Sequence, residues 1–388
     1  MANCIMVGCD LHNKTMVLRH AVGLGPVCGR TFANNPSGRQ AMIKWLHEFS
    51  PAKAGSRILF AYEASSEGFG LYDELRANGV ECYVLAPTRI ARSPKHARGK
   101  NDGRDALQLL ELLRAHVLAG NALPSVWVPD LHTRDDRELV RMRQDLAQKT
   151  TAIKNQIQAL LKRNELRRPD GTGRGWTHGY WDWIKDLSTA PAGGLGAGGR
   201  AALSSLLRQL VSIESEIETL DEQVLHLSRS DRYESKVKAL RTVKGVGVLT
   251  AMVFLAELGD LTRFSNRRQL AAYLGLTPTS NESGEQSDRK GHITRQGPSR
   301  VRKVLCQAAW SLVRTDPRAK AIYASLAGQK TDKRGKLALV AIMRQMSIVM
   351  WHRVLDGGPP ADRPGRFSRT SGAAAPASSP PESTGKAA

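Results

Sequence analysis

Apolar and polar residues in the first 90 positions follow the pattern of short strands separated by helices. Residues 36–49 have helical spacing, with apolar side chains every three or four positions, and residues 69–77 predict a second helix. Three strands, a helix and then a strand–helix–strand unit predict an α/β domain with a mixed sheet, which we place at residues 1–128. The apolar runs of strand length are residues 3–9, 15–22, 29–33, 57–61 and 81–85.

The middle of the chain, residues 129–235, has the heptad pattern of long helices. Residues 131–164 contain neither proline nor glycine, and from residue 203 aliphatic side chains fill both seam positions over four heptads. This pattern predicts a coiled coil. The first helix is basic and the second acidic, which suits antiparallel pairing within the chain and equally suits pairing between subunits. Residues 169–200, rich in Trp and Gly, predict an inserted loop or small subdomain, with its tryptophans packed against the coiled coil.

Residues 236–356 predict an all-α domain, and residues 357–388 predict a disordered tail rich in Pro, Ala and Ser. The segment VKGVGV at residues 243–248 matches the helix–hairpin–helix pattern, whose glycines let backbone N–H groups approach a phosphate. A plain tight turn is the alternative. Residues 279–300 form a polar, basic stretch, the kind of loop that holds a reactive side chain. Its hydroxyl groups include Ser280, Ser283, Ser287 and Ser299.

Four acidic residues occupy matching places in the first domain. Asp10 ends the first strand, Glu63 follows the fourth, and Asp102 and Asp105 precede a helix expected from Ala106. Residues three apart on a helix share a face, so Asp102 and Asp105 would project together. If the first and fourth strands are neighbours, the four carboxylates meet in an oxygen-rich pocket suited to Mg²⁺. Acidic residues are also favoured in a helix's first turn, which is the structural alternative for Asp102 and Asp105. Asp10 could instead cap a turn before Asn13, and Glu63 could be simply exposed.

The charge of the chain favours a polyanionic partner. There are 57 Lys and Arg against 36 Asp and Glu, a formal net charge of +21. This excess predicts nucleic-acid binding. The residues that we expect to contact nucleic acid are Arg98, Lys100, Arg104, Lys244, Gly245, Gly247, Arg289, Lys290, Arg295 and Arg300.

The five cysteines lack metal-binding spacing and predict buried, reduced thiols of a cytoplasmic, nucleoid-associated protein. No apolar run approaches the length of a membrane span, and the N-terminus lacks the pattern of a signal peptide. The composition therefore favours a DNA- or RNA-binding protein over a membrane or secreted one.

Six separate segments resemble the insertion-sequence transposases of the Asp-Glu-Asp-Asp class, a group that includes the Piv-type DNA invertases. The resemblance spans roughly residues 1–355, and the third and fifth segments are its most specific parts. The segments are GCDLH at residues 8–12, YEAS at 62–65, KNDGRDA at 100–106, VKGVGVLTA at 243–251, FSNRRQLAAYLGLTP at 264–278 and ESGEQ at 282–286.

The resemblance implies a RuvC-like N-terminal domain of the ribonuclease H fold, with Asp10, Glu63, Asp102 and Asp105 as Mg²⁺ ligands. It also implies a serine nucleophile, Ser283 by motif position, that forms a 5′-phosphoserine link to DNA. Ser280 and Ser287 lie close enough to be alternatives, because Gly284 is followed by Glu285 where the family often has a second glycine. Members of the family use an RNA encoded by the element as a guide to donor and target DNA, and they act as homo-oligomers.

Two other interpretations remain open at this point. A RuvC-like, metal-dependent junction nuclease would need the four acids and not Ser283. A non-catalytic nucleic-acid-binding protein would need neither, and Asp102→Asn would then leave cellular function unchanged.

Overall fold

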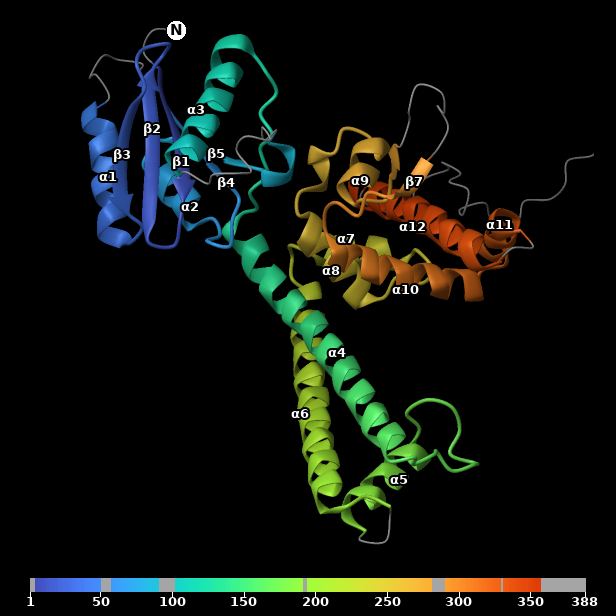
Figure 1. The fold of residues 1–388 in the computed structure, drawn as a ribbon. Helices are drawn as coiled ribbons and strands as arrows, with labels where there is room; N and C mark the ends of the chain where they lie inside the picture. Colours follow the sequence, from blue (N-terminus) through green and yellow to red (C-terminus); the bar gives the residue numbers. More distant parts are fainter. Residues whose placement is uncertain are drawn as a thin grey trace, which may run out of the picture. The chain divides into compact units, whose positions relative to one another are not determined.

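The computed structural model describes residues 4–49, 57–90, 102–190, 194–280, 290–328 and 331–356 (Figure 1). The chain divides into two compact units, Met1–Val128 and Pro129–Ala388, which are described separately below. We call them unit 1 and unit 2.

Unit 1 contains a five-stranded mixed sheet with the strand order β3-β2-β1-β4-β5. β1 pairs antiparallel with β2 and parallel with β4, so the first and fourth strands are neighbours, as the predicted acidic pocket requires. This mixed α/β arrangement is consistent with a ribonuclease H-like domain. The strands are β1 (Cys4–Leu11), β2 (Thr15–Val22), β3 (Cys28–Ala33), β4 (Arg57–Glu63) and β5 (Glu81–Leu85).

Helices cover the two faces of this sheet, α1 (Pro36–Phe49) and α2 (Gly70–Ala77) on one face and α3 (Asp102–Ala119) on the other. Side chains alternate between the faces along each strand. In β1, Ile5, Val7 and Cys9 pack toward α1 and α2, whereas Cys4 and Met6 pack toward α3.

Several bounds differ by one to four residues from those expected, and three of these lie at the predicted acidic residues. β1 continues past Asp10 to Leu11, β4 includes Glu63, and α3 begins at Asp102 rather than Ala106. Ladder pairing of Asp10 with Val17 and of Glu63 with Leu85 extends the two strands. The helix starts early because carboxylates in a first turn interact favourably with the N-terminal end of the helix dipole.

Unit 2 begins with two long helices, α4 (Leu131–Arg163) and α6 (Ala197–Ser228), that pack together within the chain. Arg143 pairs with Asp221 at 2.7 Å, and Lys154 pairs with Glu214 at 3.0 Å. The order of these pairs shows that the helices run antiparallel, and the ion pairs join the basic helix to the acidic one as the sequence suggested.

The segment between these helices is more ordered than a loop, because it contains α5 (His178–Thr189). Its three tryptophans pack, as expected, beside buried residues of α4 and α6. The Gly-rich run, expected to belong to a loop or small subdomain, is helical from Ala197. Glycine costs about 1 kcal/mol in a helix, and burial of Leu195 and Leu203 at this end of α6 offsets that cost.

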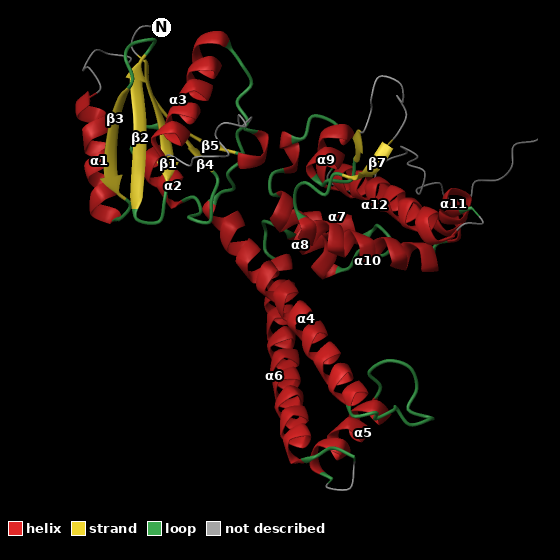
Figure 2. Cartoon of the chain, in the orientation of Figure 1, coloured by secondary structure: helices red, strands yellow, loops and turns green. Residues whose placement is uncertain are grey.

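The remainder of unit 2 is helical around α8, in which Ala251 to Leu258 are all buried. A helix that is apolar on every side belongs in a core. The expected all-α domain also contains a two-stranded hairpin, β6 (Pro278–Ser280) and β7 (Lys290–Ile293), visible in Figure 2. The helices are α7 (Glu234–Arg241), α8 (Val248–Leu258), α9 (Arg267–Tyr273), α10 (Ser299–Thr315), α11 (Pro317–Ala327) and α12 (Thr331–Leu355). Short 3-10 turns lie at Pro87–Arg89 in unit 1 and at Leu261–Arg263 in unit 2.

All five cysteines are free, and Cys4, Cys9 and Cys82 are buried as expected. Cys28 contradicts the expectation of burial, because it lies exposed on the edge strand β3. Among the described residues, none of the helices combines the length and apolar character that a membrane span requires.

Candidate active site

The face of the sheet that α3 covers carries the candidate chemistry of unit 1. Because side chains alternate along a strand, Met6, Gly8 and Asp10 share this face. Gly8 lets α3 approach closely, since a Cβ atom there would lie 2.2 Å from the Ala106 carbonyl oxygen. The close contact brings the first turn of α3, which carries Asp102 and Asp105, next to the end of β1.

Two carboxylates and one imidazole converge at this point. His12 Nε2 lies 3.0 Å from Asp10 Oδ2 and 3.4 Å from Asp102 Oδ1. One ligand atom from each of these three residues lies within 4.8 Å of the other two. The Asp10 side chain is 18% exposed and that of Asp102 is 48% exposed, so the cluster opens to solvent on the helix side.

The electrostatic environment of Asp10 reflects this crowding. Burial raises the pKa of its carboxyl group, His12 opposes that rise, and the nearby Asp105 and Asp102 carboxylates raise the pKa further. Like charges held this close repel one another unless a cation lies among them. Asp105 therefore acts on Asp10 electrostatically, although it lies outside the group of three.

Glu63 occupies the equivalent place on the neighbouring strand. Cys9 pairs with Tyr62, so Asp10 and Glu63 come next along two parallel strands. Leu59 and Ala61 pack toward α3, and Glu63 shares their face by alternation. Glu63 also lies outside the group of three: its backbone is at the site, but none of its carboxylate oxygens lies within 4.8 Å of all three ligand atoms.

The sequence reasoning missed His12, although a signal for it was present. His12 follows Asp10 by two residues, in the turn directly after the end of β1 at Leu11, and this short spacing keeps its side chain near the Asp10 carboxylate. The motif GCDLH was treated as the source of one carboxylate, whereas it supplies two converging side chains.

The donor atoms fit a divalent cation. Carboxylate oxygens are ligands for Mg²⁺ and Mn²⁺, and imidazole nitrogen is a ligand for transition metals. Asp10, Asp102 and His12 supply both kinds of donor within 4.8 Å.

Several predicted site residues fall outside the described residues, namely Arg98, Lys100, Ser283, Ser287 and Arg289. The side chains of Ser280 and Lys290 are likewise not described, although their backbones belong to β6 and β7. The hairpin itself is described at its base, where Thr279 Oγ1 donates a hydrogen bond to the His292 carbonyl oxygen at 3.0 Å.

A groove of about 700 Å³ borders this hairpin in unit 2. Pro278, Gly291 and Ile293 line one side, and aliphatic residues of α11 and α12 line most of the rest. Three arginines, Arg267, Arg268 and Arg344, also line it, and the described lining residues include no carboxylate. The groove is therefore lined mainly by apolar side chains, and the charged residues among its described lining are all arginines.

The predicted phosphate-binding turn has a packing role that the sequence did not indicate. Gly245 has a φ of +86°, and a Cβ atom there would lie 2.6 Å from the Ala308 carbonyl oxygen of α10. Gly247 has open space around its Cα. The Lys244 ammonium lies 3.2 Å from an Asp316 carboxylate oxygen.

The other predicted nucleic-acid contacts differ in their surroundings. Arg300 donates hydrogen bonds to both carboxylate oxygens of Asp145, at 2.8 and 3.0 Å. Arg104 and Arg295 are exposed, and Arg295 has an unusual positive φ of 54°. Arg104 lies in the first turn of α3, beside the acidic cluster.

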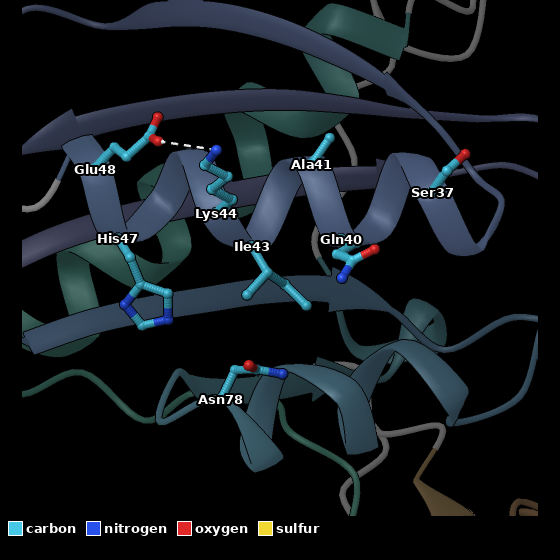
Figure 3. A pocket seen from close by; sticks show the side chains of 8 residues that line it. All are labelled: Ser37, Gln40, Ala41, Ile43, Lys44, His47, Glu48 and Asn78. Atoms are coloured by element: carbon cyan, nitrogen blue, oxygen red, sulfur yellow. Dashed lines mark ion pairs between the residues drawn. The ribbon is translucent and has the colours of Figure 1, made fainter.

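A shallow hollow of about 790 Å³ lies on the helical layer at the opposite face of the sheet (Figure 3). Its wall is formed by α1 and by Asn78 at the end of α2. Its one carboxylate among the described lining residues, Glu48, lies 3.8 Å from the Lys44 ammonium. The hollow is separate from the acidic cluster and lacks converging catalytic groups among those lining residues.

Comparison with known proteins gives matches over most of the chain. A transposase model of the DEDD type from the IS110 group matches residues 7–164, and the model for the transposase IS116/IS110/IS902 family matches residues 237–324. The chain is 34% identical over 289 residues to a putative transposase, y4qE, of Sinorhizobium fredii, covering 71% of this chain and 67% of that protein.

A second relative matches over a greater length. The transposase for insertion sequence element IS1533 of Leptospira borgpetersenii is 24% identical over 359 residues, covering 91% of this chain and 96% of that protein. The identity to y4qE, together with the two family models, establishes the relationship. The chain belongs to the IS116/IS110/IS902 family of transposases, enzymes that cleave DNA and transfer its strands.

Proposed function

We propose that this transposase cuts and rejoins DNA through a serine nucleophile, Ser283, assisted by a divalent cation that Asp10, Glu63, Asp102 and Asp105 bind. The observation that supports the metal half is the convergence of Asp10 and Asp102, which come from a strand end and a helix start 92 residues apart in the sequence. The position of Ser283 within the ESGEQ motif of the family resemblance supports the serine half.

The acidic residues have a simple task in this scheme. Asp10 and Asp102 would hold the cation, Asp105 would add negative charge beside it, and Glu63, next to Asp10 on the neighbouring strand β4, would complete the set. The cation, Mg²⁺ in our proposal, would supply stabilisation of the negative charge that develops on phosphate oxygens. Arg104, in the first turn of α3, would neutralise the DNA backbone near the acids, and we assign the same task to Arg98 and Lys100, which lie outside the described residues.

Ser283 supplies the attacking oxygen. Its Oγ forms a bond to phosphorus, the bond from phosphorus to the 3′ oxygen breaks, and the departing oxygen takes up a proton as a 3′ hydroxyl. The product is a 5′-phosphoserine link, which a free 3′ hydroxyl of another strand later reverses. A serine hydroxyl is a weak nucleophile at its free pKa, so Ser283 needs a base or a metal ion to activate it.

DNA binding follows from charge. The net charge of +21 provides a sequence-independent attraction to phosphates. The groove beside the β6–β7 hairpin, whose lining includes three arginines, suits the phosphate backbone of the DNA strand that Ser283 attacks. We assign further contacts to Lys244, Gly245, Gly247, Arg289, Lys290, Arg295 and Arg300.

A guide RNA, donor and target DNA, and a homo-oligomer complete the proposal, on the strength of the family resemblance and the basic charge. The paired helices α4 and α6 would serve as a coiled coil that sets the separation of the two chemical sites. The turn between α7 and α8 would serve as a helix–hairpin–helix, with Gly247 as its open backbone position.

Trapping of a covalent adduct tests this proposal. A donor DNA with a nick beside the cleavage site should yield a protein–DNA adduct stable in detergent, and Ser283→Ala should abolish it while divalent-ion binding is retained. Ser280→Ala and Ser287→Ala are matched controls that should keep the adduct. If one of these controls lost the adduct while Ser283→Ala kept it, that other serine would be the nucleophile in place of Ser283.

The junction-nuclease interpretation predicts a different outcome. Ser283→Ala would then cut DNA as well as the wild type, with hydrolysed ends and without an adduct, whereas Asp102→Asn would be inactive. A non-catalytic protein would give neither product in any variant.

A further inference from the structure

His12 is a side chain in the candidate active site for which the proposed function has no task. Its Nε2 atom faces two carboxylates, at 3.0 Å from Asp10 Oδ2 and 3.4 Å from Asp102 Oδ1. The two carboxylates come from different elements, β1 and α3, so the imidazole nitrogen marks the place where those elements meet.

The local backbone holds His12 in this position. Its N–H donates to the Thr15 carbonyl oxygen at 2.9 Å across the turn between β1 and β2. Its own carbonyl oxygen accepts a hydrogen bond of 2.7 Å from the Asn34 side chain. Because both backbone groups are bonded, the Cα atom of His12 is held in place, and the ring, with 30% of the side chain exposed, lies against Asp10.

A hydrogen bond to Asp10 alone explains only part of this geometry. A single N–H donates well to one oxygen, yet Nε2 is within 3.4 Å of oxygens from two residues. Ligand atoms from three residues that all lie within 4.8 Å of one another can share one ion. Neutral imidazole is among the commonest metal ligands in proteins.

We propose that His12 Nε2 is itself a ligand of the divalent cation, so that the site has a mixed nitrogen and oxygen donor set. This inference rests on the proposed function, because it requires the cation. Its consequence is a change in metal preference. Mg²⁺ favours oxygen donors, whereas imidazole suits transition metals, so His12 makes the site bind Mn²⁺ in preference to Mg²⁺.

Electron spin-echo spectroscopy of the full chain loaded with Mn²⁺ tests this directly. A coordinated imidazole modulates the echo of Mn²⁺ through its ¹⁴N nucleus, and labelling histidine with ¹⁵N changes that modulation without altering the protein. We expect the ¹⁴N modulation in the wild type, its replacement in the labelled protein, and its loss in His12→Ala. His47→Ala, which changes an exposed histidine on α1, is the matched control and should keep it.

Competition between the two metals gives a second measurement. In the wild type, Mg²⁺ should displace Mn²⁺ only at large excess, and His12→Ala should reduce this preference by about tenfold or more, which is the range measured for groups that support a metal site. Bound Mn²⁺ without ¹⁴N modulation in the wild type, or unchanged modulation in His12→Ala, would overturn the assignment and leave His12 as a hydrogen-bond partner of Asp10.

These outcomes are separable from failure of the proposed function. If the metal half of the proposal is wrong, Mn²⁺ binding is absent from the wild type or survives in Asp102→Asn. If only the role of His12 is wrong, Mn²⁺ binding depends on Asp102 but lacks the nitrogen modulation.

Discussion

Unit 1 and unit 2 each contain a glycine against which a helix packs too closely for any other residue. A Cβ atom at Gly8 would lie 2.2 Å from the Ala106 carbonyl oxygen, and one at Gly245 would lie 2.6 Å from that of Ala308. In unit 1 this contact sets the first turn of α3 against Asp10, so packing and chemistry depend on each other. In unit 2 the corresponding contact, at Gly245, lets the turn between α7 and α8 pack directly against α10.

The comparison shows what a glycine in a motif can and cannot indicate. Gly245 was expected to open the backbone to a phosphate, and the structure shows that the absence of its Cβ atom also lets α10 pack closely, with the Ala308 carbonyl oxygen as the nearest atom. The sequence around Gly8 gave no sign of its role, yet this glycine controls the geometry of the candidate active site. A glycine in a motif can indicate that another backbone segment lies close to it, but only the structure shows which segment that is.

Asp102→Asn should have the largest effect, because it removes charge from the site while leaving the Gly8 contact in place. We expect DNA cleavage to fall by about a hundredfold or more, beyond the range of about 10–100-fold for groups that only support a metal ligand. Thermal unfolding should be nearly unchanged. Asp182→Asn, which changes an exposed aspartate on α5, is the control and should leave DNA cleavage unchanged. A cleavage rate near that of the wild type would remove Asp102 from the chemistry.

Gly8→Val should couple the loss of metal binding to the loss of stability. Overpacking a close contact costs about 1–3 kcal/mol, and the clash here is with backbone, so we expect a value at the upper end. Divalent-ion affinity should fall at least tenfold as α3 moves away from Asp10. Gly198→Ala is the control, because its Cβ atom would meet open space. Unchanged ion binding in a destabilised Gly8→Val would show that packing and chemistry are independent.

Gly245→Ala should lower the stability of unit 2 without affecting ion binding in unit 1. The positive φ of +86° costs a residue with a side chain about 1–2 kcal/mol, and the contact with Ala308 adds to this. We expect the denaturation of unit 2 to shift to lower denaturant while ion binding at Asp10 is retained. A parallel loss of ion binding would mean that the two units are energetically linked.

Arg344→Ala tests the groove of unit 2 with a smaller expected effect. A single arginine on a phosphate contributes about one unit to the slope of binding against salt concentration, so the variant should lose about that much of the slope. DNA binding measured at several salt concentrations provides this number. Arg318→Ala, exposed on α11 and outside the lining of the groove, should behave as the wild type.

Asp130→Ala should give the smallest effect, confined to the start of α4. Asp130 accepts a hydrogen bond from the Thr133 N–H at 2.8 Å, and loss of such a cap costs about 1 kcal/mol. Burial opposes ionisation of Asp130, but hydrogen bonds from Thr133 and Arg232 outweigh it and lower its pKa.

The lowered pKa fixes the direction of the pH dependence. Asp130 stabilises the fold fully above its unfolded pKa of about 3.9, and the contribution is lost as the pH falls toward the folded value. The difference in unfolding free energy between the wild type and Asp130→Ala should therefore be constant at neutral pH and shrink below about pH 4. A difference that grows on acidification would contradict this assignment.

Strand and helix periodicity predicted the sheet of unit 1 because its strands appear as separate apolar runs of strand length and α1 and α2 have apolar side chains at helical spacing. The pairing of β1 with β4, which places Asp10 and Glu63 next along two neighbouring strands, was the condition for the predicted acidic pocket, and the structure fulfils it. The local approach of α3 at Gly8 could not be predicted, because it depends on a contact between residues 98 positions apart. His12 could have been considered because it lies only two residues beyond Asp10, but it belongs to the turn after β1, where strand alternation does not fix the direction of a side chain.

Predictions in unit 2 were less complete because they also depend on contacts between residues far apart in the sequence. The antiparallel pairing of α4 with α6 was one of two options, and the Arg143–Asp221 contact identifies the one within the chain. The pairing of Lys244 with Asp316 shows that a basic residue in a motif can serve the fold, and periodicity carries no information on such distant partners. Ser283 lies outside the described residues and stays a prediction, as does the division of the chain into four segments.

Cleavage of the chain by bound iron tests the central claim most directly. Fe²⁺ substituted for the natural cation, with ascorbate and peroxide, cuts the polypeptide beside its own binding site. We predict cuts near residues 10–12 and 102–105, suppressed by excess Mn²⁺ and absent from Asp102→Asn. Cuts elsewhere in the chain, or cuts that persist in Asp102→Asn, would contradict a cation site formed by Asp10 and Asp102.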